Sequence, residues 1–325
     1  VLGNKFFKAY GNNFPFLFKI LASKKPLSLQ VHPNKKQAEF GFKKENEKGI
    51  EFDDPKRNYK DNNHKPEIIC AITKFYALCG FRKHTEIYSN LSEVLGISLK
   101  KELDLFSKNL NSNGLKVLFE SLMKLSNDRI KEVLNEIRNN IKGTFSKDHE
   151  YYWVQNLSIS YSNDISVIFP LILNLFELNE NEALYLDAGV LHGYLQGTGF
   201  ELMSNSDNVI RGGLTSKHID LDELFTILKF DYSDFKKLSL VKENDNISYF
   251  KTKAKDFKLS FLDVKESNIH IINKGVSILF CYEGNGYFQL EDERIYFKKG
   301  ESFLVMSQVK TFQISGKFKI YKASI

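Results

Sequence analysis

The chain has 325 residues, of which 42% are hydrophobic and 26% are charged, and its formal net charge is +6. This length allows two or three domains, and the composition is typical of a soluble globular protein. No apolar run is long enough to cross a membrane. The modest charge suits a small anionic substrate, whereas a nucleic-acid partner would call for a clustered basic stripe. We therefore expect binding neither to nucleic acid nor to membranes.

The three cysteines, Cys70, Cys79 and Cys281, form no CxxC pair. They predict neither a disulfide framework nor a thiolate zinc site. Reduced thiols and the lack of a secretory pattern at the start favour the cytoplasm. The first residues, VLGNKFFKAYGNN, lack a starting methionine and enter an apolar strand pattern at once. We therefore expect the N-terminus to be incomplete.

Short apolar strands alternate with loops from residue 1 to about residue 82, as in FPFLFKILA, LSLQVHP and EIICAITKFYALCGF. From about residue 83 to residue 147, apolar residues recur at i, i+3, i+4 and i+7, which predicts helices. These helices lie in HTEIYSNLSEVLG, LKVLFESLMKL and DRIKEVLNEIRNNIKG. Ser126 to Asp128 would cap the last helix, and Gly143 would end it.

Strands return in SVIFPLILNLFELNENEALYLDAGVLHGYLQG, where NEN and DAG are turn signals. SKHIDLDELFTIL predicts one helix. Residues 231–325 are rich in strand patterns, and within them VSILFCYEGNGYFQLEDERIYFKKGESFLVM predicts a meander with turns at 283–286, 291–292 and 299–300. Short strands at intervals of about 8–12 residues indicate a sandwich or jelly-roll barrel. The predicted fold is mainly β, with one barrel from residues 1–82 and 148–230, a helical insertion at 83–147 and a second barrel at 231–325.

The stretch KPLSLQVHP places Ser28, Gln30 and His32 on one face of a strand, because successive side chains point to opposite faces. This face could be a solvated edge or one wall of a site. Alternation alone favours the solvated edge, since it is the commonest strand pattern.

Two further segments add groups that could bind a metal. Glu67 opens an apolar run, and a buried carboxylate must be paired, protonated or bound to metal. A turn at Asp187–Gly189 precedes a strand that carries His192 and Tyr194 on one face. With Gln30 and His32, these residues offer one amide oxygen, two imidazoles and one carboxylate. Such a set suits Zn²⁺ with a position left for water or substrate. Taken alone, Gln30 and His32 would more often lie on a solvated face, and His192 would more often be a hydrogen-bonded core residue. Glu67 alone could lie at an exposed strand start.

Charged residues elsewhere could complete such a site. Arg211 precedes two glycines that allow close backbone approach, and arginine favours bidentate contact with phosphate. Glu201 and Asp207 could act as general acid or base. The alternative for each charged residue is an ordinary solvated surface position. The candidate cations are Lys19, Lys65, Arg211 and Lys217.

Five stretches together resemble the type I mannose-6-phosphate isomerase (phosphomannose isomerase) family across the whole chain: PLSLQVHPNKKQAEFGF, RNYKDNNHKPEIICAIT, FYALCGFR, LDAGVLHGYLQGTGFELMSNSDNVIRGGLTSKHID and the final glycine-punctuated strands. The resemblance implies a zinc enzyme of the cupin superfamily. Such an enzyme interconverts mannose 6-phosphate and fructose 6-phosphate, in mannose catabolism or GDP-mannose synthesis. This family begins with several dozen further residues, including a tryptophan.

Carried over by position, the resemblance implies one zinc ion per chain, held by Gln30, His32, Glu67 and His192. Arg211 matches the active-site arginine. The remaining pocket positions are Ser28, Lys19, Lys65, Tyr194, Glu201, Asp207 and Lys217.

The reaction would move a proton between the first two sugar carbons through a cis-enediol. Glu201 is the first candidate for the base, with His64 and Asp207 second. Arg211 and Lys217 would hold the phosphate, helped by Ser28 and Lys19. We also consider a non-catalytic sugar-phosphate-binding cupin, and a cupin oxygenase, which would need more histidines. The second barrel has no comparable cluster and is interpreted as structural. We expect a monomer or a weak homodimer.

Overall fold

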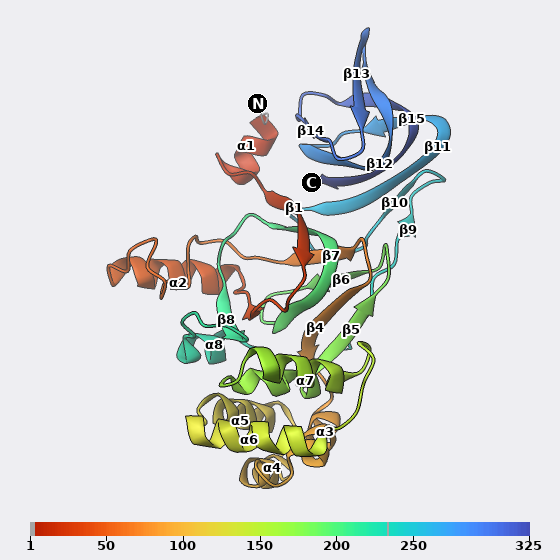
Figure 1. Ribbon diagram of the computed structural model, residues 1–325. Coiled ribbons are helices and arrows are strands. Elements are labelled where there is room, and N and C mark those ends of the chain that lie inside the picture. Colours follow the sequence, from red (N-terminus) through yellow and green to blue (C-terminus); the bar gives the residue numbers. More distant parts are fainter. Residues whose placement is uncertain (1–3, 233) are drawn as a thin grey trace.

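The computed structural model describes residues 4–232 and 234–325, and these residues form two antiparallel sheets and a group of helices (Figure 1). The first sheet has eight strands, and the helices interrupt it after the fourth, as predicted. Its strands are β1 (Phe16–Ser23), β2 (Leu29–Val31), β3 (Glu67–Ala71), β4 (Phe75–Phe81), β5 (Leu173–Leu178), β6 (Ala183–Leu186), β7 (His192–Ser204) and β8 (Ile210–Gly213).

The strand β7 organises the first sheet, because it pairs with β1, β2, β3 and β4. Its pairing with β4 shifts by one residue between Tyr194 and Gln196, and Gly197 follows with a φ of 130°. A bulge of this kind exchanges the faces on which odd- and even-numbered residues lie. His192 and Glu201 therefore share a face. In a regular strand, residues nine positions apart would lie on opposite faces.

We call the side of the first sheet that carries His192 and Tyr194 the His192 face. A buried apolar cluster lines it: Ile69, Ala71, Phe75, Ala77, Cys79, Leu178, Leu184, Leu186 and Tyr194. After the bulge, the opposite side of β7 presents Phe200 and Leu202 to the second sheet. One strand thus contributes both to the site and to the packing of the two sheets.

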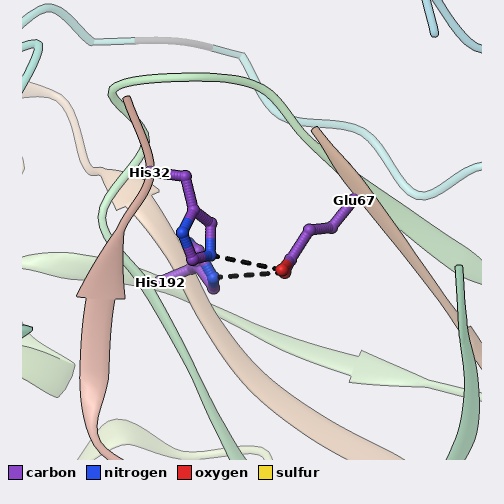
Figure 2. A group of neighbouring side chains, drawn as sticks. All are labelled: His32, Glu67 and His192. Atoms are coloured by element: carbon purple, nitrogen blue, oxygen red, sulfur yellow. Dashed lines mark ion pairs between the residues drawn. The ribbon is translucent and has the colours of Figure 1, made fainter. Parts of the chain in front are cut away.

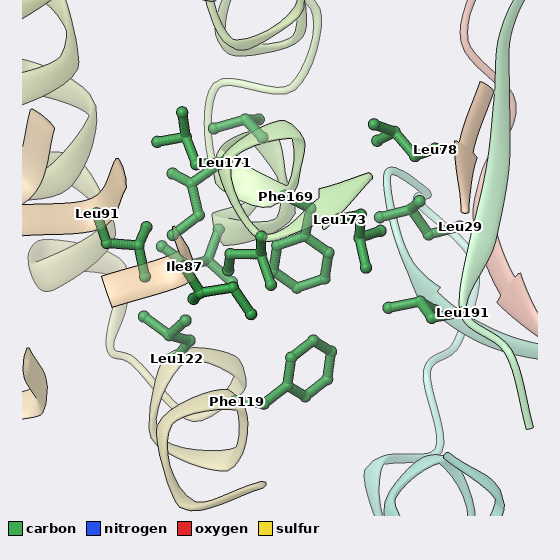
Figure 3. Close-up of a cluster of buried hydrophobic side chains, with 14 of the residues drawn as sticks. Leu29, Leu78, Ile87, Leu91, Phe119, Leu122, Phe169, Leu171, Leu173 and Leu191 are labelled. Carbon is green, nitrogen blue, oxygen red and sulfur yellow. The ribbon is translucent and has the colours of Figure 1, made fainter. Parts of the chain in front are cut away.

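The helices between β4 and β5 pack against one end of the first sheet (Figure 1). A single large core joins them to the sheet, with Phe119 and Leu122 on the helical side and Leu29, Leu78 and Leu191 on the sheet side (Figure 3). The predicted helices are confirmed as α3 (His84–Leu95), α5 (Ser112–Met123) and α6 (Asn127–Asn140), and α4 (Lys100–Phe106) lies between the first two. Ser126 caps α6 as predicted.

Helical structure continues beyond residue 147, which differs from the predicted return of strands. The segment contains α7 (Glu150–Ser160) and the 3₁₀ helix η1 (Ile165–Leu171). The prediction of a strand at SVIFPLI was wrong. All seven residues of η1 are buried, and a fully buried apolar run does not reveal its own period.

Two N-terminal helices also replace predicted strand or loop. The predicted strand at the start is the helix α1 (Asn4–Tyr10), in which the rings of Phe6 and Tyr10 contact each other one turn apart. Helix α2 (Lys35–Glu47) lies in a region read as loop. It buries few residues, so its apolar period is faint, but Asn34 and Gln37 form a capping box that marks its start. The predicted helix near Asp220 is confirmed as α8 (Leu221–Ile227).

The second sheet has seven antiparallel strands at the opposite side of the first sheet from the helices (Figure 1). They are β9 (Val241–Lys242), β10 (Ile247–Tyr249), β11 (Lys258–Ile272), β12 (Ser277–Leu290), β13 (Glu293–Lys298), β14 (Ser302–Val305) and β15 (Thr311–Ser324). The turns at 291–292 and 299–300 are confirmed. The turn predicted at 283–286 is wrong, because β12 runs through it. A register shift between Cys281 and Glu283, with Gly284 at a φ of 83°, replaces the turn by a bulge.

The two sheets share a core in which Phe200 of β7 packs against Tyr321 of β15 with tilted rings, whose centroids are 4.2 Å apart. No helix in the described part of the chain is long and apolar enough to span a membrane. The architecture is mainly β with several helices. The two-barrel layout and the boundaries at residues 82, 147 and 230 stay predictions.

Candidate metal centre

Three of the four predicted metal ligands meet at the His192 face. His32 follows β2, Glu67 begins β3 and His192 begins β7, and one ligand atom of each lies within 4.8 Å of the others. Figure 2 shows the two rings and the carboxylate directed toward one another. The His32 Nε2 atom is 3.2 Å from Glu67 Oε1, and the His192 Nε2 atom is 3.6 Å from Glu67 Oε2. All three side chains are at most 2% exposed.

Backbone carbonyls fix the orientation of both imidazoles. The His32 Nδ1–H group donates to the Asn208 carbonyl at 2.8 Å, and the His192 Nδ1–H group donates to the Val190 carbonyl at 2.9 Å. In this tautomer each Nε2 carries a lone pair. Neither Nε2 atom makes a hydrogen bond with the described residues, although both are buried. Buried polar atoms without partners are rare, so this pair of lone pairs beside a carboxylate fits a cation such as Zn²⁺.

Burial and charge set the protonation that metal binding requires. Burial lowers the pKa of His32 to about 4, so this imidazole is neutral at neutral pH. Burial would raise the pKa of Glu67, but His32 and Lys65 outweigh this and hold it well below its usual range. The group therefore presents neutral imidazole and an ionised carboxylate, which are the forms that bind metals.

Gln30 has the position predicted for it. It lies opposite His192 in the β2–β7 pairing and two residues before His32, so all three side chains share one face. Its neighbours Leu29 and Val31 point the other way into the large core. The Gln30 amide makes no hydrogen bond with a described residue. Its role as a fourth ligand stays a prediction.

Glu201 lies beside the metal group on the His192 face. In the β3–β7 pairing it stands opposite Ile69, two residues from Glu67, so the two carboxylates are diagonal neighbours. Glu201 is 4% exposed and pairs with Lys19 Nζ at 2.8 Å. Burial and the charge of Glu67 raise the pKa of Glu201, and Lys19 partly opposes the rise.

Lys65 and Tyr194 complete this group. Lys65 is buried, and its Nζ lies 3.4 Å from Glu67 Oε1. The Tyr194 hydroxyl donates to Glu67 Oε2 at 3.5 Å. Burial, then the charges of Glu201 and Glu67, raise the pKa of Tyr194 well above its usual value. At neutral pH Tyr194 is therefore a neutral hydrogen-bond donor between two carboxylates.

Ser28, Arg211 and Lys217 line one cleft of about 560 Å³, together with Asp164 and Tyr161 from the end of the helices. Arg211 pairs across the strands with Gln30, so the cleft adjoins the metal group. Burial lowers the pKa of Arg211, and its guanidinium makes no ion pair with the described residues. A half-buried arginine without a counter-charge is suited to a phosphate.

His64 and Asp207 lie in a different cavity, of about 590 Å³, which Asp256 also lines. The His64 Nε2 atom is 2.5 Å from Asp256 Oδ2. Asp207 is exposed, and its backbone N–H donates to Asp61. None of their hydrogen bonds involves the three metal-binding side chains, which leaves Glu201 as the candidate base that adjoins them.

Asn208 was not among the predicted site residues, but it is fully buried and its backbone carbonyl holds His32. Its side chain donates to the Asp61 and Asn63 carbonyls and accepts from the Lys60 and Asp61 N–H groups. A polar residue in a loop carries no periodic signal of burial, so the sequence pattern could not single it out.

Comparisons with known proteins identify the family. The model for the phosphomannose isomerase type I catalytic domain matches residues 1–84, and that for the mannose-6-phosphate isomerase cupin domain matches residues 246–324. Mannose-6-phosphate isomerase of Escherichia coli is 36% identical over 318 residues, covering 97% of this chain and 80% of that protein. Mannose-6-phosphate isomerase 2 of Arabidopsis thaliana is 30% identical over 344 residues, covering 100% and 75%.

Solved structures agree with the sequence comparison. A variant of phosphomannose isomerase from Salmonella typhimurium superposes with a TM-score of 0.93 at 34% identity, covering 99% of this chain and 81% of that one. A zinc-bound mannose 6-phosphate isomerase superposes with a TM-score of 0.92 at 34% identity and the same coverage. The chain belongs to the type I phosphomannose isomerase family.

Proposed function

We propose that this chain is a zinc-dependent aldose–ketose isomerase that interconverts mannose 6-phosphate and fructose 6-phosphate through a cis-enediol. The observation that carries the proposal is the pair of buried, unpartnered Nε2 atoms of His32 and His192 beside the Glu67 carboxylate. These three residues would hold the zinc, with Gln30 as the fourth ligand. Relatives and solved neighbours named as this isomerase, one of them zinc-bound, support the assignment.

Glu201 would move the proton between the first two sugar carbons. Its burial and the nearby Glu67 charge raise its pKa, which brings a carboxylate closer to the range in which it can both accept and release a proton. Lys19 keeps the carboxylate oriented through its ion pair. The bound zinc would supply Lewis-acid stabilisation of the negative charge that develops on the sugar oxygens. Lys65 adds a fixed positive charge beside Glu67.

The cleft at Arg211 would hold the substrate phosphate. Arg211 would supply the bidentate contact, and Lys217 and Ser28 would add a charge and a hydroxyl. Anchoring a group that does not react would fix the reacting carbons relative to Glu201, which lowers the entropic barrier to proton transfer.

The proposal extends to the molecule as a whole. The two sheets would be cupin-type jelly-roll barrels, divided at the predicted boundaries, with the second serving a structural role. Three free, buried cysteines support a reducing compartment such as the cytoplasm. We propose a monomer or weak homodimer whose product feeds mannose catabolism or GDP-mannose synthesis.

The test combines zinc analysis with a coupled assay from mannose 6-phosphate to fructose 6-phosphate. His32→Ala should lose zinc and turnover together, because it removes one of the two unpartnered imidazole nitrogens. His270→Ala, an exposed histidine of the second sheet, is the control and should keep both. Full turnover by a zinc-free His32→Ala enzyme would exclude the proposed site.

Glu201→Gln assigns the base. It should retain zinc and lower kcat by about a hundredfold or more, since general-base catalysis contributes roughly 10²–10⁴. An unchanged kcat would exclude Glu201 as the base. Zinc and phosphosugar binding without any turnover in the unaltered chain would instead favour the non-catalytic binding protein.

A further inference from the structure

The backbone that follows Arg211 has an unfavourable conformation. Gly213 ends β8 at a φ of 142°, and Leu214 follows at a φ of 51°. A residue with a Cβ atom enters this left-handed region only when its surroundings hold it there. The next residues, Thr215 to Lys217, line the same cleft as Arg211. The contacts that hold Leu214 in this conformation therefore determine the relative positions of Arg211 and Lys217, the two cations of the cleft.

Ser166 holds this segment from the helical side of the molecule. It lies in η1, is fully buried, and its Oγ accepts the Leu214 N–H at 2.8 Å. Its hydroxyl donates to Asp164 Oδ1 at 2.5 Å, and the same oxygen accepts the Ser166 N–H at 2.9 Å. A Cβ atom on Gly213 would collide with the Ser166 side chain, so the two backbones are in close contact.

Asp164 is the less expected member of this arrangement. It lines the cleft that Arg211, Lys217 and Ser28 also line, where its negative charge would repel a phosphate. Its Oδ1 atom is engaged by both the N–H and the hydroxyl of Ser166. The Asp164 carboxylate thus orients Ser166, although its charge opposes the binding of a phosphate in the cleft.

We propose that Asp164 and Ser166, which we call the 164–166 clamp, are positioning residues for phosphate binding. They act through the Leu214 backbone to hold the segment from Arg211 to Lys217 in its binding geometry. This inference rests on the proposed function, because it takes the cleft as the phosphate site. It gives η1 and its N-cap residue Asp164 a part in substrate affinity, although Ser166 is fully buried and does not line the cleft.

The first test is Ser166→Ala, with inorganic phosphate as the probe in competition with mannose 6-phosphate. Loss of the buried hydrogen bond should weaken phosphate binding and raise KM by about five- to tenfold. The change in kcat should be smaller and zinc content unchanged. Hydrogen exchange of residues 210–217 should become faster. Ser158→Ala is the matched control, since Ser158 is a buried serine of α7 that bonds only within its helix.

The second test compares Asp164→Ala with Asp164→Asn and remains decisive if Ser166→Ala does not fold. Asparagine keeps an acceptor for Ser166 while it removes the charge, so phosphate binding should be retained or tighten. Alanine removes the acceptor as well, so phosphate binding should weaken despite the lost repulsion. Tighter binding in Asp164→Ala would show that this residue acts only through its charge, and would overturn the clamp.

Arg211→Ala separates failure of the clamp from failure of the proposed function. If Arg211→Ala weakens phosphate binding and Ser166→Ala does not, the clamp is wrong and the phosphate site stands. If Arg211→Ala leaves phosphate binding unchanged, the cleft is not the phosphate site. In that case both the proposed phosphate anchor at Arg211 and the proposed role of the 164–166 clamp are wrong.

Discussion

Asn208 joins two parts of the metal centre without being a predicted ligand itself. Its backbone carbonyl accepts a hydrogen bond from the His32 ring and so fixes it. Its side-chain amide forms hydrogen bonds with the backbone of residues 60–63, which lead into Glu67. It is fully buried, and its amide oxygen and nitrogen each have two or more partners. Outer partners of this kind orient ligands and raise metal affinity.

Replacing Asn208 by aspartate should therefore weaken zinc binding. The new carboxylate cannot donate to the Asp61 and Asn63 carbonyls, and it adds charge beside Asp61. We expect zinc affinity to fall about 10- to 100-fold, measured by competition with a chelating dye. Asn273→Asp is the matched control, because Asn273 is a buried amide of the second sheet that also donates to backbone carbonyls. Unchanged zinc affinity in folded Asn208→Asp would contradict the role.

The sequence could indicate the three metal-binding residues because their signals are local. Alternation around His32, the apolar run after Glu67 and the turn before His192 all lie within a few residues. The position of Glu201 could not be derived in that way. Nine residues separate it from His192, and only the bulge near Gly197 brings both onto one face. Asn208 and the Ser166–Leu214 contact depend on tertiary pairing, for which one sequence holds no pattern.

Bulges also explain why the ends of a strand were harder to predict than the presence of the strand itself. In β12, the glycines of EGNG suggested a turn, but they accommodate a bulge inside one long strand. Both uses of glycine need a positive φ, so composition cannot separate them. The 3₁₀ helix η1 was predicted as a strand for a different reason, since complete burial removes the periodic signal.

Gly284 and Gly300 provide a direct test of the bulge. Both have positive φ, but a Cβ atom on Gly284 would collide with the Lys317 carbonyl, whereas one on Gly300 would meet open space. Gly300→Ala should cost about 1–2 kcal/mol, from the left-handed backbone alone. Gly284→Ala should cost clearly more, measured as the loss in the free energy of unfolding in urea. Equal losses would show that β12 turns at this glycine in solution.

The two sheets meet through an apolar core and one charged contact. Phe200 packs against Tyr321 across the junction. Nearby, Asp256, which precedes β11, accepts a hydrogen bond from Ser204 of β7 and pairs with His64. Burial raises the pKa of Asp256, but the hydrogen bonds from His64 and Ser204 outweigh this and leave it below its ordinary value of 3.8.

This lowered pKa predicts how the junction depends on pH. The folded protein holds the ionised carboxylate more strongly than the unfolded chain does. The stabilisation is thus complete above pH 3.8 and is lost as the pH falls through the folded pKa. Asp256→Asn should lower the free energy of unfolding by about 1–3 kcal/mol at pH 7, and the difference should shrink toward pH 3. Asp245→Asn, an exposed position, should show no such trend. A difference that did not change with pH would contradict this prediction.

The bulge in β7 has a consequence for changes in chain length. Ahead of it, His192 and Tyr194 lie on the His192 face; beyond it, Glu201 lies on that same face, while Phe200 faces the second sheet. A substitution at any of these positions alters one side only. Gain or loss of a single residue between 195 and 197 would exchange the sides for everything downstream, turning Glu201 toward the second sheet and Phe200 toward the His192 face. Insertions and deletions should therefore be tolerated in the connections around β7 but not within this three-residue interval.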